Sequence, residues 1–498
     1  MNSLRILFVT TEAEPFVAVG GLAAVMHALP VSLKRLGHDA RVMIPRYLQI
    51  DGEKWNLKME CEGLRVPTEN QTGPSHLICN VKRYDPVPSD NETVTTFFLE
   101  NMEYYEQRAN VYGYADDAVR WALLSRGTLE FLKVSSWVPD VIVVTDWHTA
   151  LLPNMLKTFY QDDTKLSRIA TVHSIHNLAH QMSGVGHRFV SPDDTDDGYS
   201  LLPAFEDAKL LKINGTKRGI IYSDAINTVS PTYAREIATP QYGEGLDELL
   251  LGKKDRLMGI MNGLNYALWD PAHDPLVEHK FSAENLAPRA KNKAVLQKHF
   301  ELPIYEDYFV VAIVSRMTVQ KGIDLLEPVI PVLLQDLPLQ LIVLGEGDSR
   351  IMEFFLNLKK IYPERIGAKF SFDPDLPHLI FDGADAALIP SRFEPSGLTQ
   401  MEAMTYGCIP IVRRTGGLAD TVKDCDSQKH TGTGFVFEKA DSLSLMIAIV
   451  RAYESFRHKE HWEQLQKRAM QTDFSWENSA RQYVSLFQRA IKAHEQSG

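Results

Sequence analysis

The sequence predicts an α/β protein with open parallel sheets, divided into at least two domains. Apolar runs with the length of buried strands alternate along the chain with helix-length segments. Several of these runs, such as LRILFVT, VIVVT and FVVAIVS, end in polar or glycine-bearing loops. The chain has 498 residues, which is longer than a domain with a single hydrophobic core usually is. Ligands of such sheets bind at the carboxyl ends of the strands, so these loops are the first candidates for a functional site.

The composition excludes several classes of partner. The net charge is −12 and no long basic run occurs, which argues against a general nucleic-acid binder. No apolar run approaches the roughly 18 residues that span a membrane, and the N-terminal run lacks a secretion-type cleavage site. The four cysteines are scattered without metal-like spacing, which favours a reducing compartment. We therefore expect a cytoplasmic protein, and the sequence leaves its oligomeric state open.

The first strand is followed by a glycine turn. Gly20 and Gly21 open the next predicted helix, so their amides could face a phosphate or a sugar. Paired glycines also begin many helices that bind nothing, and that alternative stays open. Further along, the acidic stretch 182–205 is expected to form a surface loop or lid.

Polar residues also follow two strands in the first half of the chain. Asp146 comes directly after VIVVT, at the end where a ligand is expected, although it could instead cap a helix. The next strand, RIATVHSIHN, carries His173 and His176, with His180 close behind. This spacing crosses a strand and a loop and has no matching carboxylate, so we expect no metal site and a structural role for His173.

In the second half, the strand FVVAIVS ends in a loop that carries two cations. Arg316 and Lys321 lie five residues apart in that loop. Two cations at a strand end suit a diphosphate, whose charge must be neutralised as it leaves. An ordinary solvated loop is the alternative.

The stretch from Pro390 to Val422 is predicted to be loop, helix, strand and loop. Glu394 and Glu402 lie eight residues apart in it. A helical rise would separate them by about 12 Å, the reach from a sugar ring to the ribose of a nucleotide sugar. Solvated carboxylates on an ordinary loop and helix are the alternative.

Backbone amides are expected to complete this candidate site. Gly397, Leu398 and Thr399 lie at the predicted helix N-terminus, where free amides and the helix dipole favour a phosphate. The following loop offers the amides of three more residues in an anion-binding turn: Thr415, Gly416 and Gly417. Together these features favour a nucleoside-diphosphate site.

The motif SRFEPSGLTQ, followed by VRRTGGLADTV, resembles the donor-site signature of bacterial glycogen synthases and plant starch synthases. These are retaining glucosyltransferases with two facing Rossmann-like domains, the GT-B architecture, and an active site in the interdomain cleft. The resemblance implies a starch-synthase-type acceptor domain over 1–265 and a nucleotide-sugar donor domain of glycosyltransferase group 1 type over 266–473. It also implies that a C-terminal helix, 474–498, crosses back to the first domain.

The resemblance also assigns roles to residues of the second half. Glu394 would hold the sugar hydroxyls and Glu402 the ribose, while Arg316 and Lys321 would bind the diphosphate. Phe372 stands where the family has an aromatic residue that stacks on the base. Because the cations are side chains, we expect no metal and no cofactor besides the nucleotide-sugar donor.

In the first half the resemblance covers Asp146 and His176, which would position the sugar. It also shows two departures from the family. Ala18 replaces a lysine two residues before the paired glycines, and Ala24 replaces an aspartate after them. The lysine contacts donor or acceptor in the family, so Ala18 is expected to change an affinity.

The resemblance therefore implies transfer of glucose from ADP-glucose, or UDP-glucose, to the non-reducing end of an α-1,4-glucan with retention. One alternative is a related retaining glycosyltransferase with another donor or acceptor, since bacterial glycogen synthases often have an aromatic or small residue at the position that Glu402 occupies here. Another is a catalytically silent glucan-binding relative, which the loss of lysine at Ala18 would suit. A Rossmann dehydrogenase is disfavoured because no G-x-G-x-x-G follows the first strand.

Overall fold

The computed structural model describes residues 3–87, 89–181 and 196–497, and these form two compact units. Unit 1 comprises Met1–Gly263 and Trp476–Gly498, and unit 2 comprises Leu264–Ser475. Most of the stretch expected as an acidic loop or lid lies outside the described residues. Each unit is a parallel-sheet α/β domain, which confirms the predicted fold class.

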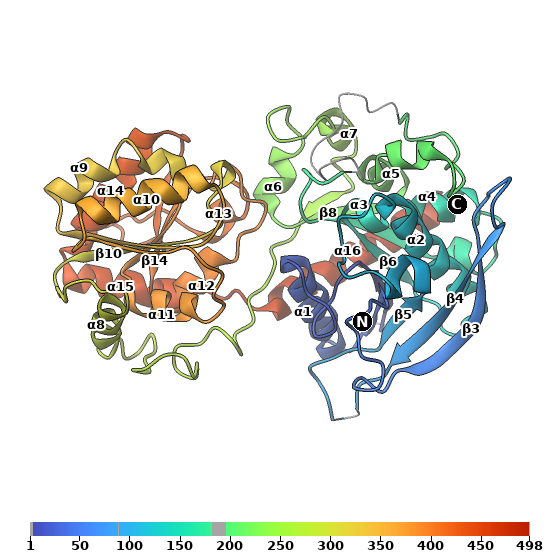
Figure 1. The fold of residues 1–498 in the computed structure, drawn as a ribbon, viewed down its shortest axis with the longest axis horizontal. Coiled ribbons are helices and arrows are strands. Elements are labelled where there is room, and N and C mark those ends of the chain that lie inside the picture. The colour runs from blue at the N-terminus through green and yellow to red at the C-terminus, as the bar shows by residue number, and fades with distance from the viewer. Residues whose placement is uncertain (1–2, 88, 182–195, 498) are drawn as a thin grey trace. The chain divides into compact units, whose positions relative to one another are not determined.

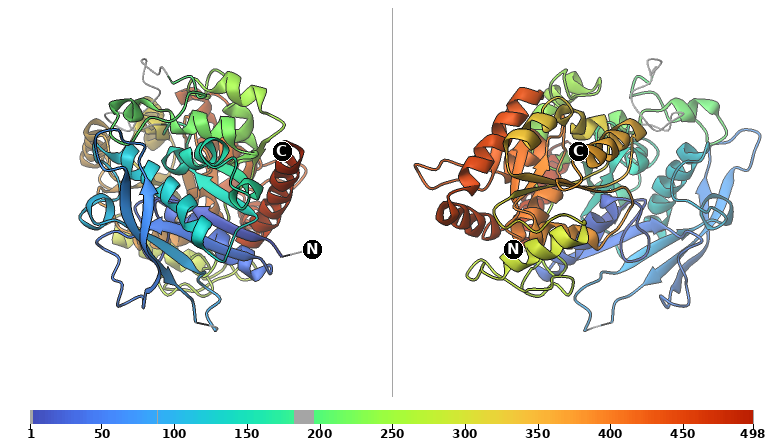
Figure 2. Two further views of the ribbon diagram at one scale, coloured as in Figure 1. Left: turned by 90° about the vertical axis from the view of Figure 1, so that its right-hand side faces the viewer. Right: turned by 60° about the vertical axis from the view of Figure 1, so that its left-hand side comes forward.

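Unit 1 is built on a nine-stranded sheet in its described residues, with the order β3-β4-β5-β2-β1-β6-β7-β8-β9. The strands are β1 (Arg5–Val9), β2 (Asp39–Pro45), β3 (Lys58–Pro67), β4 (His76–Tyr84), β5 (Thr96–Glu100), β6 (Val141–Thr145), β7 (Ala170–Ile175), β8 (Ala225–Thr228) and β9 (Leu257–Gly259). All neighbours are parallel except in the β3-β4-β5 meander, whose long strands form one edge of the sheet (Figure 2). The order reverses direction between β1 and β6, so the loops after these two strands flank the topological switch point.

The helices of unit 1 pack on this sheet. They are α1 (Gly21–Arg35), α2 (Asp117–Val134), α3 (Asp146–Thr149), α4 (Leu151–Thr158), α5 (Gly215–Tyr222), α6 (Pro231–Glu236), α7 (Asp247–Gly252) and α16 (Trp476–Ser497). Short 3-10 or π turns span Met102–Glu106, Leu166–Arg168 and Ala208–Lys212. None of the helices in the described residues has the length and apolar composition that crossing a membrane requires.

Unit 2 has a six-stranded, wholly parallel sheet with the order β12-β11-β10-β13-β14-β15. Its strands are β10 (Phe309–Val314), β11 (Leu339–Leu344), β12 (Ile366–Lys369), β13 (Ala386–Ile389), β14 (Ile409–Arg413) and β15 (Phe435–Phe437). This is the doubly wound order, with the switch point between β10 and β13. The strands are almost wholly buried, as expected when helices cover both faces.

Helices lie on both faces of this sheet (Figure 1). They are α8 (Arg289–His299), α9 (Ile330–Asp336), α10 (Ser349–Ile361), α11 (Leu376–Gly383), α12 (Thr399–Thr405), α13 (Gly416–Thr421), α14 (Ser442–Phe456) and α15 (Lys459–Met470). Short 3-10 turns span Val319–Lys321 and Ile323–Leu326. The helix that the sequence predicts between Pro390 and Val422 is therefore present as α12, with Gly407 at positive φ after its end.

The C-terminal helix α16 is part of the core of unit 1. Its apolar residues recur at helical spacing, and Trp476, Tyr483 and Phe487 are all buried. The Phe487 ring packs edge-on against Phe8 of β1 at 6.3 Å between centroids. The Tyr483 hydroxyl is within 3.0 Å of Asn227 Oδ1 on β8. The last segment of the chain thus stabilises the first strand.

We predict that Phe487→Ala destabilises the protein by about 3–5 kcal/mol, because it removes a fully buried ring and leaves a cavity against β1. Denaturant unfolding of the full chain measures the effect. Lys492→Ala, an exposed position on the same helix, is the control and should change stability by less than about 0.5 kcal/mol. Equal effects of the two substitutions would contradict this role of α16.

Candidate functional site

Three loops of unit 2 meet at the carboxyl ends of neighbouring strands. We call them the three-loop site: residues 315–322 after β10, 390–398 after β13, and 414–417 after β14. β10, β13 and β14 are adjacent in the sheet, and β10 and β13 flank the switch point. The sheet therefore brings together candidate residues that are about 20 to 100 positions apart in sequence.

Glycines allow the three loops to touch through their backbones. A Cβ on Gly322, whose φ is +66°, would overlap the carbonyl oxygen of Pro390. Cβ atoms on Gly416 and Gly417 would overlap the carbonyl oxygens of Glu394 and Ser396. Glycine is therefore required at these positions for a steric reason. The Gly417 amide donates to the Glu394 and Pro395 carbonyls at 3.1 and 3.2 Å, so the protein itself engages an amide that the sequence offered to an anion.

Two arginines fix the loop after β13. Arg413 is buried at the end of β14. Its Nε donates to the Ser391 carbonyl at 2.8 Å, and its Nη2 donates to the Arg392 carbonyl. Arg392 pairs with Asp324 at 2.5 Å, and its amide donates to the Gln320 carbonyl at 2.8 Å. The loop after β10, which carries Arg316 and Lys321 and is called the cation loop below, is thus connected to the loop of Glu394 by several polar contacts.

Glu394 and Lys321 form an ion pair inside this site. Lys321 Nζ lies 2.5 Å from Glu394 Oε2, and the hydroxyl of Ser391 donates to the same oxygen at 2.9 Å. Glu394 is 7% exposed, so the pair is largely removed from water. Two residues that the sequence suggested separately, for sugar and for diphosphate, are in direct contact.

Glu402 has a different environment on α12. Burial raises the pKa of its carboxyl to about 7, and no cation or hydroxyl of the described residues is recorded beside it. The turn that precedes it, with Gly397 at a φ of +70°, is held by Gln400, whose side-chain amide donates to the Gly397 carbonyl at 2.9 Å. Leu398 precedes the first residue of α12, Thr399, so both lie where the sequence placed them.

A cavity of about 790 Å³ opens beside the three-loop site, at the ends of β10, β11 and β12. Arg316 lines it together with Gly345 and Glu346. Phe372 stands at it with 85% of its surface exposed, and its amide donates to Glu346 Oε1 at 3.1 Å. The volume is in the range of small-molecule sites and suits a nucleoside. A larger cavity of about 1180 Å³ beside α14 and α15 contains none of the predicted site residues.

In unit 1, Glu12 follows β1 at the switch point and organises the glycine turn. Its Oε2 accepts the amides of Val19 and Gly20 at 2.6 and 2.9 Å, and its Oε1 accepts the hydroxyl of Tyr112 at 2.9 Å. The Gly20 amide is therefore engaged by a carboxylate of the protein itself, while Gly21 begins α1. Ala18 is exposed in this turn. Sequence reasoning missed Glu12 because its partners lie up to 100 residues away.

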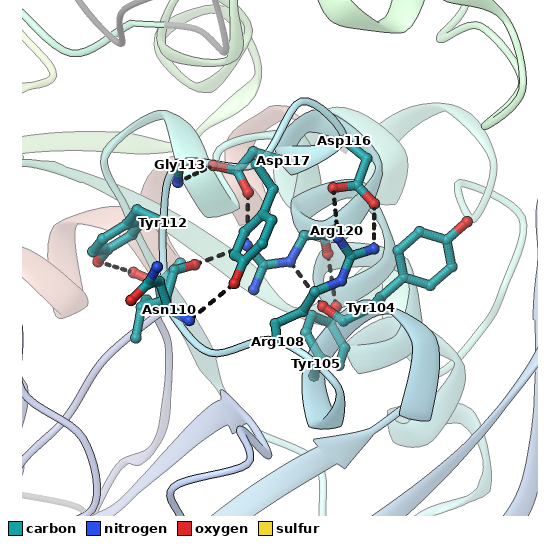
Figure 3. Close-up of polar contacts among 12 residues, drawn as sticks. Tyr104, Tyr105, Arg108, Asn110, Tyr112, Gly113, Asp116, Asp117 and Arg120 are labelled. Carbon is teal, nitrogen blue, oxygen red and sulfur yellow. Dashed lines mark hydrogen bonds and ion pairs between the residues drawn. The ribbon is translucent and has the colours of Figure 1, made fainter.

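The loop that carries Tyr112 is held by two ion pairs, of which one is buried and the other partly exposed (Figure 3). Arg120 pairs with Asp117 at 2.6 Å and donates to the carbonyls of Tyr104 and Val111. Arg108 pairs with Asp116 at 2.6 Å. This aromatic stretch is thus a fixed support for Glu12.

Asp146 and His176 meet at the ends of β6 and β7. Asp146 has a φ of +45°, and its Oδ1 accepts the amides of His176 and Asn177 at 2.7 and 3.2 Å. Burial lowers the pKa of His176, which keeps its ring neutral near pH 7. Burial also lowers the pKa of His173 to about 4, and this ring contacts the Asp146 carbonyl at 3.2 Å. Within the described residues, no group of three or more His, Cys, Asp or Glu side chains is placed to hold a metal ion.

Residues 5–252 match the family model of the starch synthase catalytic domain, and residues 295–469 match that of glycosyl transferases group 1. The chain is 40% identical to the glycogen synthase of Thermotoga maritima over 98% of its length and 99% of that protein. It belongs to the family of glycogen and starch synthases. The glycogen synthase of Geobacillus stearothermophilus is also 40% identical, over 99% of both chains.

Solved structures agree with this family. The catalytic domain of starch synthase IV from Arabidopsis thaliana, bound to ADP and acarbose, superposes with a TM-score of 0.81 at 29% identity, covering 99% of this chain and 100% of that one. The protein therefore has the GT-B type of fold and is a glucosyltransferase of the glycogen synthase type.

We predict that Gly417→Ala lowers the turnover number on the order of 100-fold, because the added methyl group pushes the loops of Ser396 and Gly417 apart and displaces Glu394. A glycosyltransferase assay beside a melting curve measures this. Gly252→Ala, where a Cβ meets nothing within 4 Å, is the control and should keep wild-type turnover. A fully active Gly417→Ala variant would show that the close backbone contact is dispensable.

Proposed function

We propose that this protein transfers glucose from ADP-glucose to the non-reducing end of an α-1,4-glucan, with retention of the anomeric configuration. The observation that carries the proposal is the Lys321–Glu394 pair, beside Arg316 and a nucleoside-sized cavity at the switch point of unit 2. The related glycogen synthases and the starch synthase bound to ADP and acarbose support both substrates. UDP-glucose is the alternative donor.

We assign each part of the donor to residues of unit 2. Phe372 and the cavity would take the base, and Glu402 the ribose. Arg316 and Lys321, with the amides of residues 397–399, would bind the diphosphate. Glu394 would hold the sugar hydroxyls. In unit 1, Asp146 and His176 are the proposed contacts of the transferred glucose, with the neutral His176 ring able to donate or accept a hydrogen bond.

The proposed reaction depends on stabilising the leaving group. The bond from the anomeric carbon to the diphosphate oxygen loosens first, and the diphosphate leaves with the electron pair. Arg316 and Lys321 neutralise the charge that develops. The acceptor hydroxyl attacks from the same face, and its proton passes to a diphosphate oxygen. Side-chain cations supply the positive charge in this scheme, so it requires no metal.

The four cysteines are free in the structure, which supports the proposed location in the reducing cytoplasm.

The deciding experiment is incubation with ADP-glucose or UDP-glucose and a maltooligosaccharide. Release of the nucleoside diphosphate and chain extension are measured together. Faster extension with ADP-glucose is the expected result. Extension only with a different donor or acceptor would support the related transferase, and glucan binding without turnover of any nucleotide-glucose would support the silent relative.

We predict that Glu394→Gln lowers turnover at least 100-fold while the melting temperature stays within a few degrees, because a contact to the reacting sugar contributes several kcal/mol only in the transition state. Initial rates of nucleotide release measure the loss. Glu438→Gln, an exposed glutamate paired with Arg414 at 2.6 Å, is the matched control and should retain activity. Near-normal turnover of a folded Glu394→Gln variant would exclude the proposed role.

We predict that the donor KM falls as pH rises from 6 to 8. Burial raises the pKa of Glu402 to about 7, so the ribose-binding carboxylate forms only above that pH. Glu402→Gln should remove this dependence. The stability of the folded protein changes with pH in the opposite sense. Because the pKa of Glu402 is raised in the folded state, this group favours folding below the ordinary pKa of a glutamate, and that contribution is lost as pH rises through about 7. A donor KM that does not depend on pH would contradict the assignment.

A further inference from the structure

Ser391 forms a hydrogen bond to Glu394 that the sequence motifs did not predict. Its hydroxyl donates to Glu394 Oε2 at 2.9 Å, and Lys321 donates to the same oxygen at 2.5 Å. The other oxygen, Oε1, has no recorded hydrogen-bond partner among the described residues. One oxygen of Glu394 is thus anchored by the protein, and the other is available to a ligand.

The backbone of Ser391 is held in place independently of Glu394. Its carbonyl accepts Arg413 Nε at 2.8 Å, and the preceding residue, Pro390, packs against Gly322. Ser391 has no exposed surface, so water cannot replace its hydroxyl. The direction of this hydroxyl is therefore set by β14 and by the cation loop.

Lys321 cannot serve Glu394 and a bound diphosphate equally well. The two anions compete for one ammonium group, and the stronger charge of the diphosphate draws it away from the carboxylate. This step rests on the proposed function. A largely buried carboxylate that loses the cation paired with it is strongly disfavoured unless another donor remains.

We propose that Ser391 is a positioning residue, which keeps the Glu394 carboxylate directed at the sugar while Lys321 moves to the diphosphate. The hydroxyl is the donor that stays behind when the ammonium group leaves. Ser391 acts through Glu394 and touches no substrate. Its loss should therefore affect the chemical step more than the binding of the donor.

The chain supplies a control in the same unit. Ser455 lies on α14, outside the three-loop site, and its buried hydroxyl has no hydrogen-bond partner among the described residues. Ser391→Ala and Ser455→Ala therefore each remove one buried hydroxyl from unit 2, and only the first removes a hydrogen bond to Glu394.

The test compares wild type, Ser391→Ala, Ser391→Cys and Ser455→Ala, using ADP-glucose and maltooligosaccharide, with melting temperatures. Ser391→Ala should lower kcat about 10- to 100-fold, the equivalent of one hydrogen bond to a charged group. Its donor KM should stay within about twofold, because the hydroxyl contacts Glu394 and not the donor. Ser391→Cys, a weaker donor of similar size, should be intermediate and remains informative if the alanine variant fails to fold. Ser455→Ala should match wild type.

An unchanged kcat in Ser391→Ala would overturn the assignment, as would an equal loss in Ser455→Ala. A donor KM that rises as much as kcat falls, or a loss of kcat in both Ser391 variants that follows their melting temperatures, would show a structural role and would also overturn it. If the wild type turns over neither ADP-glucose nor UDP-glucose, the proposed function fails and this inference fails with it. An active wild type with an unaltered Ser391→Ala variant contradicts only the role of Ser391.

Discussion

The ion pair between Lys321 and Glu394 is the interaction on which the candidate site depends. It requires β10 and β13 to be neighbours and the loops after them to touch, which Gly322, Gly416 and Gly417 permit. Removing two charges from water is costly, and a pair in this position is stable only if its geometry is good and further donors satisfy the carboxylate. Ser391 supplies such a donor. The sheet order, the glycines and the buried serine thus serve one purpose, to hold two opposite charges in contact at the switch point.

Much of this arrangement could be predicted from sequence, and the limits have physical causes. Strand ends and glycine turns are local features, so the loops of Arg316, Glu394 and Gly417 could be placed at the carboxyl edge of one sheet. The partners of those residues are not local. Arg413 reaches the Ser391 carbonyl only because β13 and β14 are in a particular register. A hydroxyl three residues before a glutamate is common, and nothing in the sequence indicates that it points at the carboxylate.

The same limit applies in unit 1, where the candidate groups are already engaged by the protein. The sequence offered the Gly20 amide to a ligand, but Glu12 accepts it. The Asp146 carboxylate accepts two amides of the following strand's end, which fixes His176 beside it. These contacts link residues 8 to 31 positions apart and depend on the turn geometry. They also show how the turn at Ala18 is held without the family's lysine, since the Glu12 carboxylate supports the backbone of residues 19 and 20 directly.

The two glutamates of the donor motif show how similar groups eight residues apart acquire different tasks. Glu394 has a cation and a hydroxyl as partners, so a ligand must displace the cation before the carboxylate can serve it alone. Among the described residues Glu402 has neither, and burial raises its pKa to about 7, so a hydroxyl of a ligand would improve its environment and favour its ionised form. Under the proposed roles, donor binding would therefore break an existing interaction at Glu394 and supply a missing one at Glu402. The proposed ribose contact would then be a source of the binding energy that frees Lys321 for the diphosphate.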